Sequence, residues 1–219
     1  MSSEKYGFNP RFVEMILNDL QVYTTEILGI YYRDFQNDVI VPLSETWYAP
    51  EAQIVVRNKV GEIKAKVGGD FVQGVLFIND CINQGAISWA NAVGDTFSRK
   101  NLDYDTVGCI LDDLIIKSDN NGFRGIISEK VGDINVNIEK LRIRTTEAVT
   151  KMINSVSACD AFIGAQQMED IVQTLRNQQT TLTKYILEDI NELKSTVDVT
   201  MDKYQQTAQT NAQRFASGN

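Results

Sequence analysis

The sequence predicts an all-α protein, an elongated four-helix bundle built from two tandem helical hairpins with a short connector helix. Apolar residues recur at steps of three and four over long stretches, which places them on one face of each helix. The only prolines are at positions 10, 42 and 50, so no proline interrupts a helix after that point. An aromatic residue followed two positions later by a small one separates two such stretches twice, at Trp47 and Phe162, and 162 − 47 = 115 positions separate the two.

The first hairpin is expected over residues 1–102. Asn9 followed by Pro10 is typical of a helix start, and Pro42 should kink or loosen the last turns of that helix. We expect the turn at Trp47-Tyr48-Ala49-Pro50, because Pro50 suits the first position of a new helix. The apolar stripes of the two helices are Phe12, Ile16, Leu20, Tyr23, Ile27, Tyr31, Phe35, Val39 and Leu43, then Val56, Val60, Ile63, Val67, Phe71, Val75, Ile78, Ile82, Trp89, Val93 and Phe97.

Glycines lie inside the second of these helices, where each costs up to about 1 kcal/mol relative to alanine. They indicate either close approach of a neighbouring helix or a bent, frayed helix. The residues concerned are Gly61, Gly68, Gly69, Gly74 and Gly85.

Residues 103–121 are expected to form a connector with one short helix, roughly over residues 105–117, because the apolar pattern breaks there. The second hairpin is expected over residues 122–219, with its turn at Phe162-Ile163-Gly164. Gly7-Phe8 and Gly122-Phe123 share the same offset, 122 − 7 = 115, so each half is predicted to begin with an equivalent Gly-Phe. The stripes here are Ile127, Val131, Ile134, Ile138, Leu141, Thr145, Ala148, Met152 and Val156, then Met168, Val172, Leu175, Leu182, Ile186, Leu193, Val197, Met201, Tyr204, Ala208 and Phe215.

Composition narrows the function classes. The net charge is −8 without a basic cluster, which argues against a nucleic-acid partner. The chain has no histidine, and its acid–base groups form no catalytic constellation, so we expect no enzyme, cofactor or metal site. Cys81, Cys109 and Cys159 are expected to be buried structural thiols. The acidic residues Glu188, Asp189 and Glu192 are most simply a solvated helix face.

The N-terminal residues contain no apolar run typical of a signal peptide, and no stretch has the length of a membrane span. We therefore expect a protein made in the cytoplasm with no integral membrane span.

An acidic helical hairpin with Trp-x-Gly between its helices resembles the WXG superfamily, the early-secreted-antigen-like proteins handled by type VII secretion systems of Gram-positive bacteria. The first turn is close to the variant with alanine in place of glycine, and Phe162-Ile163-Gly164 keeps the glycine but replaces the tryptophan. Family members usually pair as hairpin dimers, so the chain resembles such a dimer fused into one polypeptide. The resemblance implies secretion or attachment to the cell envelope, with the type VII machinery, a larger effector or another WXG-like protein as partner.

The family's export signal is Tyr-x-x-x-Asp/Glu near the end of the second helix. Tyr185 and Asp189 have this spacing but stand early in the helix, whereas Tyr204 is better placed and has Ala208 where the acid should be. Trp47 and Phe162 are core aromatics on one interpretation, and part of a surface recognised by a secretion partner on the other.

The first hypothesis for function is therefore a non-enzymatic type VII substrate, adaptor or targeting partner that acts through helix–helix contacts and can form a homodimer. The alternatives are a membrane-active helical protein, which the short apolar run Val75-Leu76-Phe77-Ile78 supports best, and a structural rod of a phage or filament.

Overall fold

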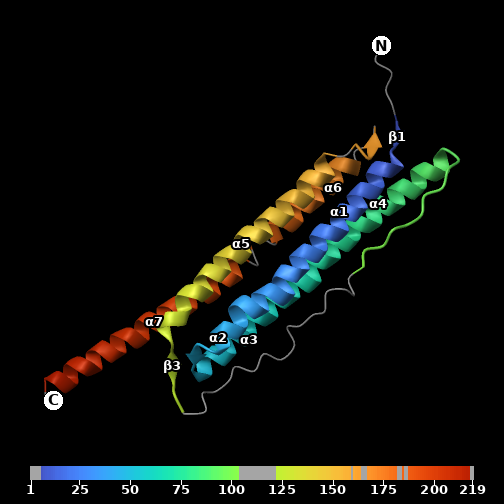
Figure 1. Cartoon of the computed structure of the whole chain (residues 1–219). Helices are drawn as coiled ribbons and strands as arrows, with labels where there is room; N and C mark the ends of the chain where they lie inside the picture. Colours follow the sequence, from blue (N-terminus) through green and yellow to red (C-terminus); the bar gives the residue numbers. More distant parts are fainter. Residues whose placement is uncertain are drawn as a thin grey trace.

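A computed structural model describes residues 6–103, 122–158, 160–163, 167–181, 184 and 187–217 of the chain. These residues are mostly helical, which confirms the predicted all-α class. The helices run along one another in a long rod (Figure 1). No helix of the described part is both long and apolar enough to cross a membrane. The predicted connector helix near residues 105–117 lies outside the described residues.

The first long helix runs through α1 (Pro10–Gly29), two π-helical stretches (Ile30–Asp34 and Gln36–Ile40) and α2 (Val41–Ser44). The Asn9 side chain accepts hydrogen bonds from the backbone N–H groups of the first turn, which confirms the predicted start. The expected loosening before Pro42 takes the form of π-helical turns. Pro42 has no N–H for the carbonyl of Asp38, and the Asn137 side chain donates to that carbonyl instead, at 3.0 Å.

The second long helix consists of α3 (Pro50–Ala65), a π-helical stretch (Lys66–Phe71) and α4 (Val72–Ala92). A Cβ added at Gly68 would lie 2.8 Å from the Tyr32 hydroxyl, and one added at Gly74 would overlap the Gln178 amide. Close approach of a neighbour therefore accounts for these two glycines. At Gly61 and Gly69 an added Cβ would meet only open space.

Phe97 does not lie on this helix, contrary to the prediction. α4 ends at Ala92, and Gly94, with φ of +74°, reverses the chain direction. Phe97 lies in the returning segment, where its ring packs edge-on against Phe8 with 6.5 Å between ring centroids.

The second hairpin contains α5 (Ser128–Ser157), α6 (Gln167–Thr180) and α7 (Leu187–Ala216). The predicted stripe of α5 is buried from Val131 to Val156. The prediction for Phe215 is wrong, because its side chain is 86% exposed. α7 runs past the end of the other helices (Figure 1), and residues 205–217 are all exposed.

Within the described residues, four strands of two residues each join the hairpins reciprocally, although strand signals in the sequence are weak. β1 (Gly7–Phe8) pairs antiparallel with β4 (Phe162–Ile163), and β2 (Trp47–Tyr48) pairs antiparallel with β3 (Gly125–Ile126). The strand before each hairpin therefore pairs with the turn of the other hairpin. This corrects the predicted equivalence of Gly7-Phe8 with Gly122-Phe123, because Gly125-Ile126 takes that place.

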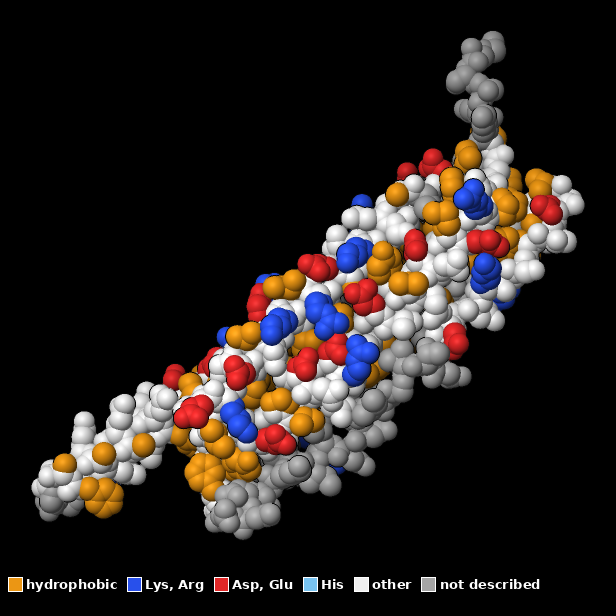
Figure 2. Space-filling model, viewed as in Figure 1, with side chains coloured by type: hydrophobic (Ala, Val, Ile, Leu, Met, Phe, Trp, Pro, Cys, Tyr) orange, Lys and Arg blue, Asp and Glu red, His pale blue; other side chains and the backbone are white. Residues whose placement is uncertain are grey.

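The two strand pairs lie at opposite ends of the rod (Figure 1). We call the end with β2 and β3 the Trp47 end, and the end with β1 and β4 the Phe162 end. Between them, α1 packs against α4 and α5, α4 packs against α6, and α3 packs against α7. The core of this arrangement includes the buried aromatic residues Tyr31, Phe35, Trp47 and Phe71. On the face shown in Figure 2, acidic and basic side chains are interspersed along the rod.

Candidate interaction sites at the hairpin turns and helix contacts

The first turn is built around Trp47, which is only 1% exposed. Its burial supports the interpretation as a core aromatic, and the Tyr204 hydroxyl lies near its indole N–H. The Tyr48 hydroxyl donates to the carbonyl of Glu45 at 2.8 Å, and its ring packs edge-on against Phe123. Ala49 has extended backbone and Pro50 begins α3, as predicted.

Tyr204 lies against this turn although it is far away in the sequence. Its hydroxyl donates to Glu51 Oε1 at 2.6 Å. This hydrogen bond is the main cause that lowers the pKa of Glu51, whereas burial is the main cause that raises the pKa of Tyr204, followed by the bond to Glu51. The candidate signal residue on α7 is therefore held at the Trp47 end, and Ala208 follows on the projecting part of the helix.

The second turn is described only at Phe162 and Ile163. Phe162 is 5% exposed and pairs with Phe8, so it too is a core aromatic. Ile163, in contrast, is 42% exposed. Gly164 lies outside the described residues.

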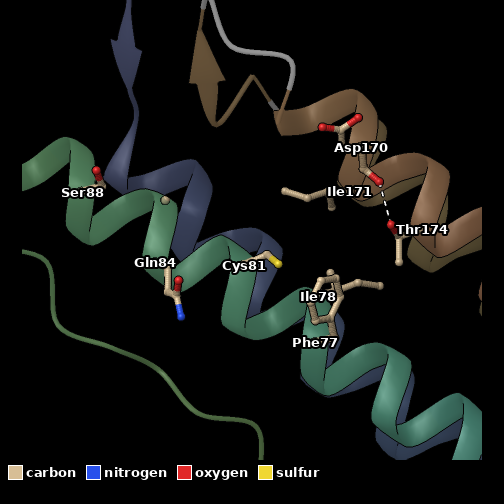
Figure 3. Close-up of a pocket in the computed structure, with 9 residues that line it drawn as sticks. Phe77, Ile78, Cys81, Gln84, Ser88, Asp170, Ile171 and Thr174 are labelled. Atoms are coloured by element: carbon tan, nitrogen blue, oxygen red, sulfur yellow. Dashed lines mark hydrogen bonds between the residues drawn. The ribbon is translucent and has the colours of Figure 1, made fainter.

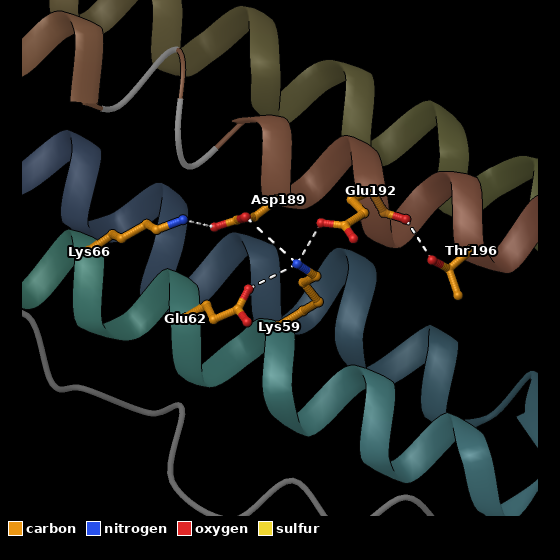
Figure 4. Close-up of polar contacts among 6 residues, drawn as sticks. All are labelled: Lys59, Glu62, Lys66, Asp189, Glu192 and Thr196. Atoms are coloured by element: carbon orange, nitrogen blue, oxygen red, sulfur yellow. Dashed lines mark hydrogen bonds and ion pairs between the residues drawn. The ribbon is translucent and has the colours of Figure 1, made fainter.

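Asp189 is in an ion-pair cluster, not on a solvated face. Its side chain is buried between α3 and α7, where it pairs with Lys66 and lies 3.7 Å from Lys59 Nζ (Figure 4). Lys59 also pairs with Glu192 at 2.6 Å and Glu62 at 2.9 Å, and these carboxylates raise the pKa of Lys59. The prediction of a solvated acidic face is therefore wrong for Asp189. Tyr185 lies outside the described residues, so its pairing with Asp189 as a signal stays a prediction.

A groove of about 520 Å³ lies between α4 and α6 near the Phe162 end (Figure 3). Phe77, Ile78 and Cys81 line it from α4, and Ile171 and Thr174 line it from α6. Cys81 is half-buried here, which corrects the expected full burial, and desolvation raises the pKa of its thiol. Cys109 and Cys159 lie outside the described residues.

Sequence reasoning missed two amide side chains that hold the segment after α4. Asn83 on α4 donates to the carbonyl of Lys100 and accepts from its N–H, both at 2.8 Å. Gln21 on α1 bonds Asp103 in the same way, at 2.8 and 2.7 Å. No sequence pattern indicates these contacts, because the partners are far apart in the chain and use backbone atoms.

The polar groups of these sites join helices, turns and backbone within the chain. Within the described part of the chain, no group of three or more cysteine, aspartate or glutamate side chains could hold a metal ion.

Comparison of the chain with protein-family models, with curated proteins and with solved structures finds no match. The resemblance to the WXG superfamily therefore rests on the turn motifs and the hairpin pattern alone.

Proposed function

We propose that this protein is a non-enzymatic substrate or adaptor of a type VII secretion pathway, in which it acts through helix–helix contacts. On this proposal the chain is a four-helix bundle of two tandem WXG-like hairpins, equivalent to a hairpin dimer fused into one polypeptide. Its partners are the secretion machinery and a larger effector or another WXG-like protein. The protein is made in the cytoplasm and reaches the cell envelope or the medium through that pathway.

The observation that carries this proposal is the reciprocal strand pairing. Gly7–Phe8 pairs with the second turn, and Gly125–Ile126 pairs with the first turn. The backbone bonds beside the strands repeat the relation, from Asn9 N–H to the Ala161 carbonyl at 2.8 Å and from Ile127 N–H to the Thr46 carbonyl at 2.9 Å. Two equivalent hairpins that exchange equivalent contacts have the symmetry of a two-fold dimer.

The projecting end of α7 supports the same proposal. It stands clear of the rod and begins beside Tyr204, whose hydroxyl is bonded to the first turn. A partner could therefore contact this helix end together with the exposed residues of the Trp47 end, such as Ile54.

The test is fractionation of the native host with and without its secretion ATPase. We expect the protein in the medium or envelope only when the ATPase is present. Ala208→Glu completes the Tyr-x-x-x-Glu spacing from Tyr204 and should increase export several-fold, whereas Tyr204→Ala should decrease it. Tyr185→Phe serves as the comparison for the second candidate signal. Retention of all variants in the cytosol, with no secretion component co-purifying, would contradict the proposal.

A second experiment tests the fused dimer separately. Residues 1–102 and 122–219 are expressed apart and together. Each half alone should be unstable or self-associating, because it exposes one side of its apolar stripes, and the two should form a stable complex when mixed. Monomeric, helical and cooperatively folded halves would disprove the fused-dimer interpretation.

A further inference from the structure

The segment that returns from α4 is bound by the protein in the way a peptide ligand would be. We call residues 97–103 the strap. We propose that the surface of α1 and α4 that the strap covers, called the groove below, is a binding site for an extended peptide, and that the strap occupies this site as an internal ligand. The occupant we infer is a partner peptide with the strap's chemistry: an aromatic residue, a basic pair two and three positions later, and then leucine.

Backbone recognition in this groove is independent of the ligand's sequence. A carboxamide carries one acceptor and one N–H₂ donor, which match the N–H and C=O of a peptide unit. Asn83 binds Lys100 in this manner and Gln21 binds Asp103, with all four distances between 2.7 and 2.8 Å. Asn83 is fully buried and also donates to the carbonyl of Asn79, so its orientation is fixed.

Side chains of the strap supply the specificity. Phe97 packs against Phe8 at the Phe162 end, and Leu102 packs against the hydrophobic core. Between them, Arg99 pairs with Asp80 on α4, and Lys100 lies 3.5 Å from Glu14 on α1. The groove therefore offers two apolar contacts, one carboxylate from α4 and one carboxylate from α1. This set of contacts is complementary to a basic peptide flanked by apolar residues.

An internal ligand has a large advantage over one in solution. Because the strap is tethered, its effective concentration is in the millimolar range or above, so a weak free peptide cannot displace it unless the strap is weakened. The strap therefore blocks the site in the intact protein, and a partner peptide gains access only by displacing the strap. This inference concerns a different surface from the proposed export signal and does not depend on secretion.

The test uses a fluorescent synthetic peptide with the sequence of residues 95–103 and full-length protein. Wild type should show no binding at micromolar concentrations. Phe97→Ala and Leu102→Ala, each made separately, weaken the strap and should bind the peptide, as measured by fluorescence polarisation. Circular dichroism verifies that each variant keeps its helix content, and either variant alone suffices for the test.

Groove variants then locate the binding. In the strap-weakened protein, Asn83→Ala or Gln21→Ala should weaken peptide binding about tenfold, since each removes two hydrogen bonds. The matched control is Gln84→Ala, next to Asn83 on α4, because among the described residues the Gln84 side chain bonds Asp80 on its own helix and not the backbone of the strap. Failure of the strap-weakened variants to bind, or equal binding by the groove variants and the control, would overturn the proposal. Loading of the wild-type groove by a second copy's strap, seen as a dimer, would also overturn it.

Discussion

The two ends of the rod have the same strand pairing but differ in what surrounds it. At the Trp47 end, the second helix of the other hairpin continues past the turn, and Tyr204 bonds to Glu51. At the Phe162 end, α4 stops at Ala92 and the strap turns back along the rod. The offset of 115 also relates Trp89 to Tyr204, since 204 − 89 = 115, so aromatic residues occupy corresponding positions on α4 and α7.

The helix contacts near the two ends differ as well. By the same offset Asp189 corresponds to Gly74, since 189 − 74 = 115. The α3–α7 contact thus carries a charged cluster where the α4–α6 contact carries a glycine beside the Gln178 amide. The two helix contacts therefore differ in their polar groups: an ion-pair cluster lies between α3 and α7, whereas an open groove lies between α4 and α6.

The largest expected effect concerns the turn aromatics. Trp47→Ala and Phe162→Ala should each lower the free energy of unfolding by about 3–5 kcal/mol, because each leaves a cavity where a strand of one hairpin meets the other. Trp47→Ala should have the greater effect, since its side chain is larger and less exposed. Urea unfolding followed by circular dichroism measures both. An equal or larger loss for Phe162→Ala would remove the proposed difference between the ends.

The ion-pair cluster should give the next largest effect. Asp189→Asn leaves Lys59 and Lys66 without their buried carboxylate and should cost about 1–3 kcal/mol of stability. Glu188→Gln, at the neighbouring exposed position, is the matched control and should change little. The same urea titration distinguishes them, and similar values for the two variants would show that the cluster is only a surface feature.

Two glycines in the second long helix should respond in opposite directions. Gly61→Ala should raise stability by up to about 1 kcal/mol, because alanine favours helix and its Cβ meets open space. Gly68→Ala should lower stability by about 1 kcal/mol, because the rigid Tyr32 ring must move away from the new methyl group. Thermal unfolding midpoints measure both, and a stabilising Gly68→Ala would show that helix propensity, not close approach, governs this position.

The smallest effect is a pH dependence at the Trp47 end. The pKa of Glu51 is lowered in the folded state by the Tyr204 hydrogen bond. The stabilisation that Glu51 contributes to the folded state is therefore complete above the unfolded pKa of about 4.3, and it is lost as the pH falls through the folded pKa. Tyr204→Phe should remove a few tenths of a kcal/mol at neutral pH and flatten this part of the acid profile. An unchanged profile of unfolding free energy between pH 2 and 6 would contradict the assignment.

Sequence reasoning located the helices well, because burying an apolar stripe imposes a periodicity that the residues from Ile16 to Leu43 and from Val131 to Val156 display directly. Core burial was one of two interpretations of the turn aromatics Trp47 and Phe162, and both side chains are buried. Sequence reasoning missed the partner of Trp47, because a strand of two residues such as Gly125–Ile126 has no periodicity to detect. It also misjudged Asp189 and Phe215, since the burial of a residue on α7 depends on where the other helices end and on which charges face it.

The reciprocal strand pairing has a consequence for the order in which the protein can fold during synthesis. Phe8 leaves the ribosome early, but its partner Phe162 follows 162 − 8 = 154 residues later. At synthesis rates of about 5–20 residues per second, the first strand is synthesised on the order of ten seconds before its partner. Trp47 is likewise synthesised before its strand partner Ile126. Neither hairpin can complete its own end alone, so the final folding step must come after the second turn has been made.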